Sequence, residues 1–163
     1  MIQLFLRKTN LPILCKQLPL IALFSQAIRL GLWTAVTIWQ LQNRIQQYIL
    51  DNFYGEQPVG TSFIIKANDK GQSLIHTPSM RVPQKIKDES VIYQCMRSTL
   101  ICAKQNNVKS IVIPLFGGGC GKVAPSIIAK MMNLAYVQIN NPPQKLDWKY
   151  VEYVNTMLYV SRL

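Results

Sequence analysis

The pattern of apolar and polar positions predicts alternating strands and helices from residue 39 onward. Helical spacing of apolar residues, with polar side chains on the other face, occurs over 39–53, 88–104 and 123–136. Short apolar runs rich in β-branched residues predict strands over 61–67, 73–77 and 110–115, the first two joined as a hairpin. Segment 148–158 fits a strand or a helix, and its aromatic spacing favours a helix. Strands that alternate with helices predict an α/β fold.

A glycine-rich loop lies between the strand over 110–115 and the helix over 123–136. Four of its five positions are glycine (Gly117, Gly118, Gly119 and Gly121), and Cys120 is the exception. Glycines let the backbone approach a ligand closely and turn its N–H groups toward one point. The start of the following helix adds N–H groups and the positive end of the helix dipole. A tight turn needs one or two glycines, so four favour a phosphate-binding loop over a plain turn.

Two familiar phosphate loops do not fit this stretch. From Gly117 to Lys122 the loop is one residue too short for a Walker A motif, and Val123 stands where that motif has a hydroxyl for magnesium. The dinucleotide fingerprint fits only from Gly119, ending on Ala124, and no acidic residue follows near position 140 to hold a ribose. The loop therefore belongs to another class of phosphate site.

Residues 114–123, P-L-F-G-G-G-C-G-K-V, resemble the diphosphate-binding loop of macro domains, and most of all that of the phage-type branch. The stretch L-I-H-T-P-S-M-R-V-P at 74–83 resembles a strand and loop of the same branch, and Val91-Ile92-Tyr93 begins a matching helix. The resemblance covers about 39–135. It implies a three-layer α/β/α fold with a mixed sheet, and a cleft that binds ADP-ribose or an ADP-ribosylated macromolecule.

The resemblance also implies site residues. Backbone N–H groups of Gly118 to Lys122 would hold the diphosphate, with Val123 near the distal ribose. The ligand-binding set is then Gly117, Gly118, Gly119, Cys120, Gly121, Lys122 and Val123. His76 and Thr77 are candidate cleft residues at a strand end, although a single histidine is more often a structural hydrogen-bonding residue. No catalytic residue is assigned, because the Asp88–Glu89 pair fits helix capping better than acid–base chemistry.

Composition limits the partners and cofactors. The chain of 163 residues carries 18 Lys and Arg against 7 Asp and Glu, a net charge of +11, which favours an anionic ligand. No dense basic run or RNA-recognition signature is present, so no specific nucleic-acid partner is predicted. The four cysteines and the single histidine have no metal-ligand spacing, so neither a metal nor a cofactor is expected. We expect free thiols in a reducing cytoplasm.

Residues 1–38 differ from the domain predicted over 39–163. They contain no Asp or Glu and are largely apolar, with scattered Arg and Lys. Segment 18–38 is long enough for a membrane anchor, although Arg29 in its middle makes insertion costly. A signal peptide is a further interpretation, but Lys16 and Gln17 break its apolar region.

A frame shift offers a third interpretation of this segment. Phage-type macro domains carry a first ligand loop of the form P-S-N-S-F-G-F-M-D-G-G, which this chain lacks. Codons for residues 25–36, read from their third base, permit that string without a break. Our hypothesis is a frame-shifted translation of a macro domain start, together with a short deletion before residue 39.

These observations predict a cytoplasmic protein that binds ADP-ribose. Hydrolysis of the ligand is left open, because chemistry in hydrolytic macro domains draws on the first loop. Two other classes remain. One is a membrane-anchored basic protein whose first 38 residues are the true translation. The other is a phage-derived structural protein with a degenerate macro fold that no longer binds ligand.

Overall fold

The computed structural model describes residues 3–7, 35–67 and 72–161. The shifted string proposed for 25–36 and the candidate membrane or signal segment fall almost entirely outside these ranges. Within them, no helix is both long and apolar enough to cross a bilayer.

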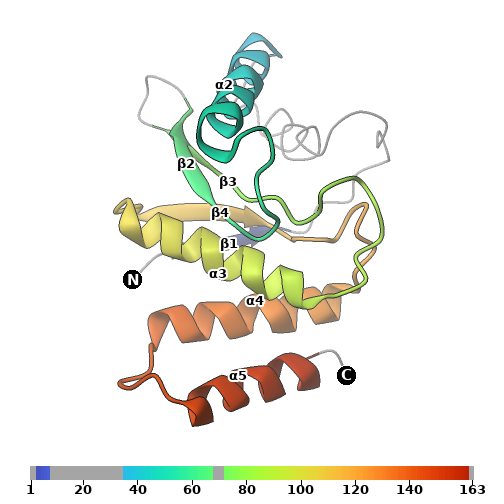
Figure 1. Cartoon of the computed structure of the whole chain (residues 1–163), viewed down its shortest axis with the longest axis vertical. Coiled ribbons are helices and arrows are strands. Elements are labelled where there is room, and N and C mark those ends of the chain that lie inside the picture. Colours follow the sequence, from blue (N-terminus) through green and yellow to red (C-terminus); the bar gives the residue numbers. More distant parts are fainter. Residues whose placement is uncertain (1–2, 8–34, 68–71, 162–163) are drawn as a thin grey trace.

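The described chain contains four strands and four helices in the order shown in Figure 1. The strands are β1 (Gln3–Arg7), β2 (Phe63–Lys66), β3 (Ser73–His76) and β4 (Ser110–Pro114), and the helices are α2 (Ala35–Phe53), α3 (Ser90–Gln105), α4 (Pro125–Asn140) and α5 (Trp148–Val160). The α/β class is therefore confirmed, as are the three predicted helices and the helical alternative for the last segment. The helix predicted over 123–136 begins and ends later than expected, because Ala124 is extended and Pro125 opens the helix.

The strands pair in two separate sheets among the described residues. β2 and β3 form the predicted hairpin, with Phe63 opposite His76 and Lys66 opposite Ser73. β4 pairs in parallel with β1, and the register joins Gln3 to Ser110 and Arg7 to Pro114. The described strands thus include parallel and antiparallel pairs, while the three-layer arrangement stays a prediction.

The main core lies where α3 and α4 pack on β4. Ile92 and Met96 of α3 meet Ile128 and Met131 of α4, and all four are fully buried together with Ile113 of β4. Lys104 ties the same helices at their far ends by donating to the carbonyl of Ile139 at 2.6 Å. This core fixes the strand before the glycine loop and the helix after it.

A second core holds the β2–β3 hairpin under α2. Leu41 and Ile45 of α2 are buried against Phe63 and Ala67. The rings of Tyr48 and Phe63 stack with their centroids 4.2 Å apart. The periodicity over 39–53 therefore marks a helix that covers the hairpin.

Candidate functional site: the glycine loop after β4

The loop joins β4 to α4, and packing demands glycine at two of its positions. Gly117 has a φ of +75°, and a Cβ there would lie 2.6 Å from Cδ1 of Ile92. A Cβ on Gly121 would lie 2.7 Å from the carbonyl oxygen of Gly117. Both residues are buried. Tight packing within the loop thus accounts for two of its four glycines.

Three backbone hydrogen bonds close the loop on itself. The N–H of Gly118 donates to Leu115, that of Lys122 to Gly119, and that of Val123 to Gly117, at 3.2, 3.1 and 3.1 Å respectively. Lys122 reaches this geometry with a φ of +51°, in the left-handed region that glycine normally occupies. The loop is therefore held in one shape by its own backbone before any ligand binds.

The exposed side of the loop has the properties of an anion site. Gly118 and Gly119 are exposed, and a Cβ on Gly119 would meet no atom within 4 Å. Within the described part of the chain, the N–H group of Gly119 has no hydrogen-bond acceptor, and neither has that of the buried Gly121. Gly119 thus faces open space without a packing reason for its lack of a side chain.

The helix that follows leaves its first turn without a side-chain cap. Ala124 occupies the N-cap position and makes no capping hydrogen bond, and Pro125 has no N–H. The first internal bond of α4 runs from the N–H of Ile128 to Ala124 at 3.0 Å. The positive end of the helix dipole therefore lies directly after the loop, as the sequence predicted.

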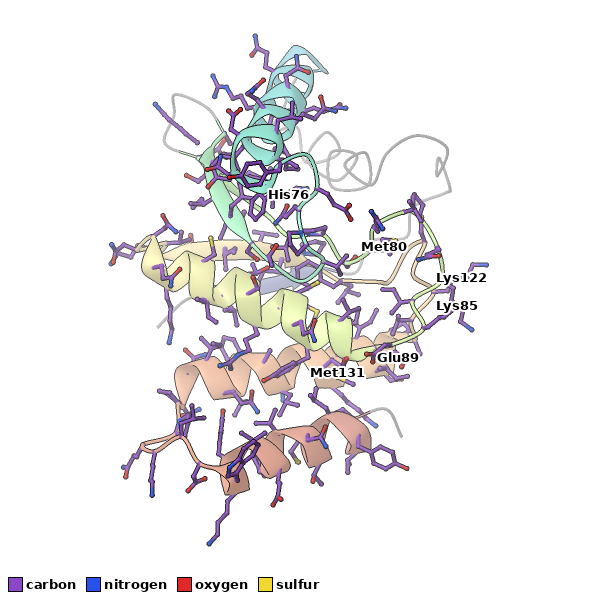
Figure 2. All side chains as sticks on the ribbon, in the orientation of Figure 1. His76, Met80, Lys85, Glu89, Lys122 and Met131 are labelled. Atoms are coloured by element: carbon purple, nitrogen blue, oxygen red, sulfur yellow. The ribbon has the colours of Figure 1, made fainter. Side chains whose placement is uncertain are left out.

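A neighbouring segment forms one wall of the loop. The N–H of Ile86 donates to the carbonyl of Gly121 at 3.0 Å, and its buried side chain lies against Gly117 and Gly121. Figure 2 shows Lys85 and Lys122 at the same edge of the molecule, as this bond requires. Ile86 also lines a hollow of about 280 Å³, together with Val59, Ser79, Met80, Arg81, Gln84, Lys85 and Lys87.

His76 is buried in the second core. Its Nδ1 lies 2.6 Å from Oε1 of Gln57, an acceptor, so Nδ1 carries the proton of the neutral ring. The ring also packs on Phe63, with centroids 5.3 Å apart. Burial lowers the pKa of His76 to about 4. The side chain is thus a neutral hydrogen-bonding residue, and its contact with a ligand stays a prediction.

The hydroxyl of Thr77 belongs to a chain of hydroxyls between the hairpin and α3. It lies 2.6 Å from Oγ of Ser62 and 2.9 Å from Oγ1 of Thr99, and Ser98 donates to Ser62 at 2.7 Å. Buried hydroxyls are costly when unpaired, and these hydroxyls satisfy one another. Their hydrogen bonds link the end of β3 to α3. The predicted role of Thr77 in ligand binding is not tested by these contacts.

The cysteines and the acidic pair behave in different ways. Cys120 is disulfide-bonded, so the expectation of free thiols is wrong for this residue. Cys95 and Cys102 are free, as expected, and are buried on α3, and burial raises the pKa of Cys95 to about 12. Oδ1 of Asp88 accepts the N–H of Ser90 at 3.0 Å, but the N-cap position of α3 is Glu89, which makes no side-chain capping bond.

Two residues that position the glycine loop and His76 were not identified from the sequence. Ile86 supports the glycine loop, and Gln57 orients His76 while donating to the carbonyl of Thr61 at 3.0 Å. A lone apolar residue between Lys85 and Lys87 in a polar stretch was the available signal for Ile86. No local pattern marks Gln57, because its partner lies in another element.

A strand, a self-closed glycine loop and a helix start define a class of α/β proteins that bind phosphate groups at this junction. Comparison with family models gives the narrower answer. The macro domain model matches residues 39–132, which is more than half of the chain, so this protein belongs to the macro domain family. Neither the curated proteins nor the solved structures gave a match. Macro domains as a family bind ADP-ribose.

Proposed function

We propose that this protein binds ADP-ribose, free or attached to a macromolecule, with its diphosphate on the loop from Gly117 to Val123. One observation carries the proposal. Gly119 faces open space, and its N–H and that of Gly121 have no acceptor among the described residues. Such groups, next to an uncapped helix start, attract a diphosphate.

The loop geometry refines which groups would bind. The N–H groups of Gly118 and Lys122 already donate within the loop, and Gly121 is buried, so the proposed diphosphate contact falls first to the exposed Gly119. Lys122 adds an exposed positive charge, and Val123 is buried beneath the loop. The proposal includes the three-layer sheet arrangement and a cytoplasmic location, although the disulfide at Cys120 removes free thiols as an argument for that location. Cell fractionation tests the location.

The proposal is limited to binding. Asp88 is engaged at the start of α3, and His76 is a neutral, buried group with an internal partner. Neither provides a general acid or base at the loop in this arrangement. Hydrolysis can be tested separately, by incubating the protein with an ADP-ribosylated peptide and measuring released ADP-ribose.

The substitution Gly119→Glu tests the loop assignment. Open space around Gly119 lets the longer side chain fit without strain, while its carboxylate would repel a diphosphate. Isothermal titration with ADP-ribose should show binding by the native chain and a loss of at least about 100-fold in the variant, which corresponds to roughly 3 kcal/mol.

Asn133→Glu is the matched control, because it adds the same charge on an exposed position of α4 outside the loop. Its affinity should stay within about threefold of native, since an exposed charge at a distance is screened by salt. Equal binding by native protein and Gly119→Glu would disprove the loop assignment. Absence of binding by the native chain would disprove the function itself.

A further inference from the structure

Two lysines from separate segments of the chain flank the glycine loop. The N–H of Ile86 donates to the carbonyl of Gly121, and Lys85 and Lys122 are the residues directly bonded to these two groups. Standard bond lengths along this path keep the Cα atoms of the two lysines within about 10 Å of each other. A lysine carries its charge at the end of a flexible four-carbon stem. Both ammonium groups can therefore reach the same small anion.

Both lysines are exposed, and Figure 2 shows them at the same edge of the molecule. Within the ranges that the structure describes, neither forms a salt bridge. The acidic residues of the surrounding segments have other positions or partners. Glu56 pairs with Arg81, and Asp88 accepts the N–H of Ser90. Glu89 occupies the N-cap position of α3. The two lysines thus bring positive charge to the edge of the loop.

The backbone of Lys122 gives an independent indication that its side chain is used. Its φ of +51° lies in the left-handed region, where a side chain costs conformational energy and glycine does not. Among the described residues, none bonds to its ammonium group, so packing gives no reason for a lysine here. A side chain that is kept in a costly backbone conformation supports a functional role for that side chain.

We propose that Lys85 and Lys122 form a cationic clamp on the diphosphate at the glycine loop, which adds Lys85 to the ligand site. The inference rests on the proposed function, because the diphosphate at Gly119 supplies the negative charges that the clamp would hold. Ammonium groups bind phosphate oxygens as point charges and need no fixed orientation. The glycine loop then sets the position of the diphosphate, while the clamp neutralises its charge.

Isothermal titration of the full chain with ADP-ribose at about 50 mM NaCl tests the clamp, because low salt screens the charges least. Lys85→Gln and Lys122→Gln remove one charge each and keep a polar side chain. Each should weaken binding at least about fivefold, and the double variant at least about twentyfold. Raising the salt to about 500 mM should weaken binding by the native chain more than binding by the double variant.

Lys122→Gly separates the charge of the side chain from the strain of its backbone. Glycine fits a positive φ without cost, so the urea denaturation midpoint of the variant should equal or exceed that of the native chain, while its affinity falls at least about fivefold. Tyr54→Gly is the matched control. Tyr54 has a φ of +53° and is 96% exposed at the end of α2, so its replacement should affect stability in the same direction and leave affinity unchanged.

A second control tests whether overall charge is sufficient. Lys109→Gln removes the same charge at an exposed position before β4, at the opposite end of that strand from the loop. Its affinity should stay within about twofold of native, because a distant exposed charge is screened. Equal weakening by Lys109→Gln and Lys85→Gln would overturn the clamp, as would native affinity in Lys85→Gln or in Lys122→Gly.

Inorganic pyrophosphate, used as a second probe, separates the clamp from the proposed function. A native chain that binds pyrophosphate with the same dependence on Lys85, but does not bind ADP-ribose, would support the clamp and disprove the function. A native chain that binds neither would overturn both. Binding of ADP-ribose that is indifferent to the loss of Lys85 would leave the function standing and remove the clamp.

Discussion

The four glycines of the loop after β4 are constrained by different neighbours. Gly121 has the backbone of Gly117 and the side chain of Ile86 against it, so there is no room for a methyl group. Gly119 has nothing near the corresponding position. Packing therefore explains Gly121, whereas no neighbouring atom requires glycine at position 119.

This contrast predicts that one alanine substitution destabilises the protein and that the other leaves its stability nearly unchanged. Gly121→Ala should lower the free energy of unfolding by about 1–3 kcal/mol, because the new Cβ meets a backbone oxygen that cannot move away. Gly119→Ala should change it by less than about 0.5 kcal/mol. Urea denaturation followed by circular dichroism measures both. Equal losses would show that the loop adopts another shape.

His76 predicts how stability depends on pH. Its pKa falls from 6.5 in the unfolded chain to about 4 in the folded protein. The unfolded chain therefore binds a proton first as the pH falls, and stability is lost between these two values. This lowering of the pKa corresponds to about 3 kcal/mol of stability, which is fully present above pH 6.5 and lost by about pH 4. Denaturation at several pH values measures the slope.

His76→Gln is the matched variant, because it keeps an N–H donor for Gln57 and removes the titrating group. Its stability should change less than that of the native chain between pH 6.5 and 4. The same slope in both proteins would assign the effect to carboxylates elsewhere.

Residue patterns marked the position of the glycine loop better than they marked its surroundings. Gly117 to Val123 stood out because they are contiguous in the sequence. Ile86 and Gln57 did not stand out, because their roles come from contacts with residues distant in the sequence. Ile86 contacts Gly121, which is 35 positions away, and Gln57 contacts His76, which is 19 positions away. The resemblance placed His76 in the cleft, while its residue type favoured a structural hydrogen-bonding role, and its bond to Gln57 is of that structural kind.

At the scale of elements, the packing of α3 on α4 should dominate stability. Ile128 of α4 is fully buried, and Val137 of the same helix is 46% exposed. Ile128→Ala should cost about 2–5 kcal/mol in free energy of unfolding, through lost apolar contacts and the cavity left behind.

Val137→Ala, which also truncates a β-branched side chain on α4, should cost less than about 1 kcal/mol. Chemical denaturation measures the two variants under the same conditions. A comparable loss in both would mean that the α3–α4 contact is not the centre of the core.

Most elements could be predicted from periodicity, because burial on one face imposes it. The three helices and the β2–β3 hairpin fall close to their predicted positions. The aromatic spacing of α5 indicated a helix correctly but could not show that several of those aromatics face solvent, since the same pattern serves a buried or an exposed face. The parallel partner of β4 was not predicted, because it lies far away in the sequence.

At the scale of the whole molecule, ligand binding should raise thermal stability. A ligand that binds only the folded state at 100 times its Kd adds about 2.7 kcal/mol. For a domain of this size the melting temperature should rise by roughly 5–10 °C with ADP-ribose. Differential scanning fluorimetry measures the shift. AMP, which lacks the diphosphate, should give a clearly smaller one, and equal shifts would contradict a diphosphate site.

The family and the α/β class followed from motifs along one stretch, about 39–135, of which the family model matches 39–132. The origin of residues 1–38 is a question about the gene. The bases across codons 25–36 decide the frame-shift hypothesis, because they either encode the missing loop in the shifted frame or exclude it. The sequence alone could not place this segment, since it shares no pattern with the domain that follows.

The pairing of β1 with β4 has a consequence for the order of folding. Its first partners, Gln3 and Ser110, are 107 positions apart, whereas β2 and β3 are separated by a short turn. Contacts that close long stretches of chain are entropically expensive and form late. The hairpin and the α3–α4 pair should therefore assemble first. During synthesis on the ribosome, β1 would therefore stay unpaired with β4 until β4 has been made. The glycine loop is synthesised directly after β4.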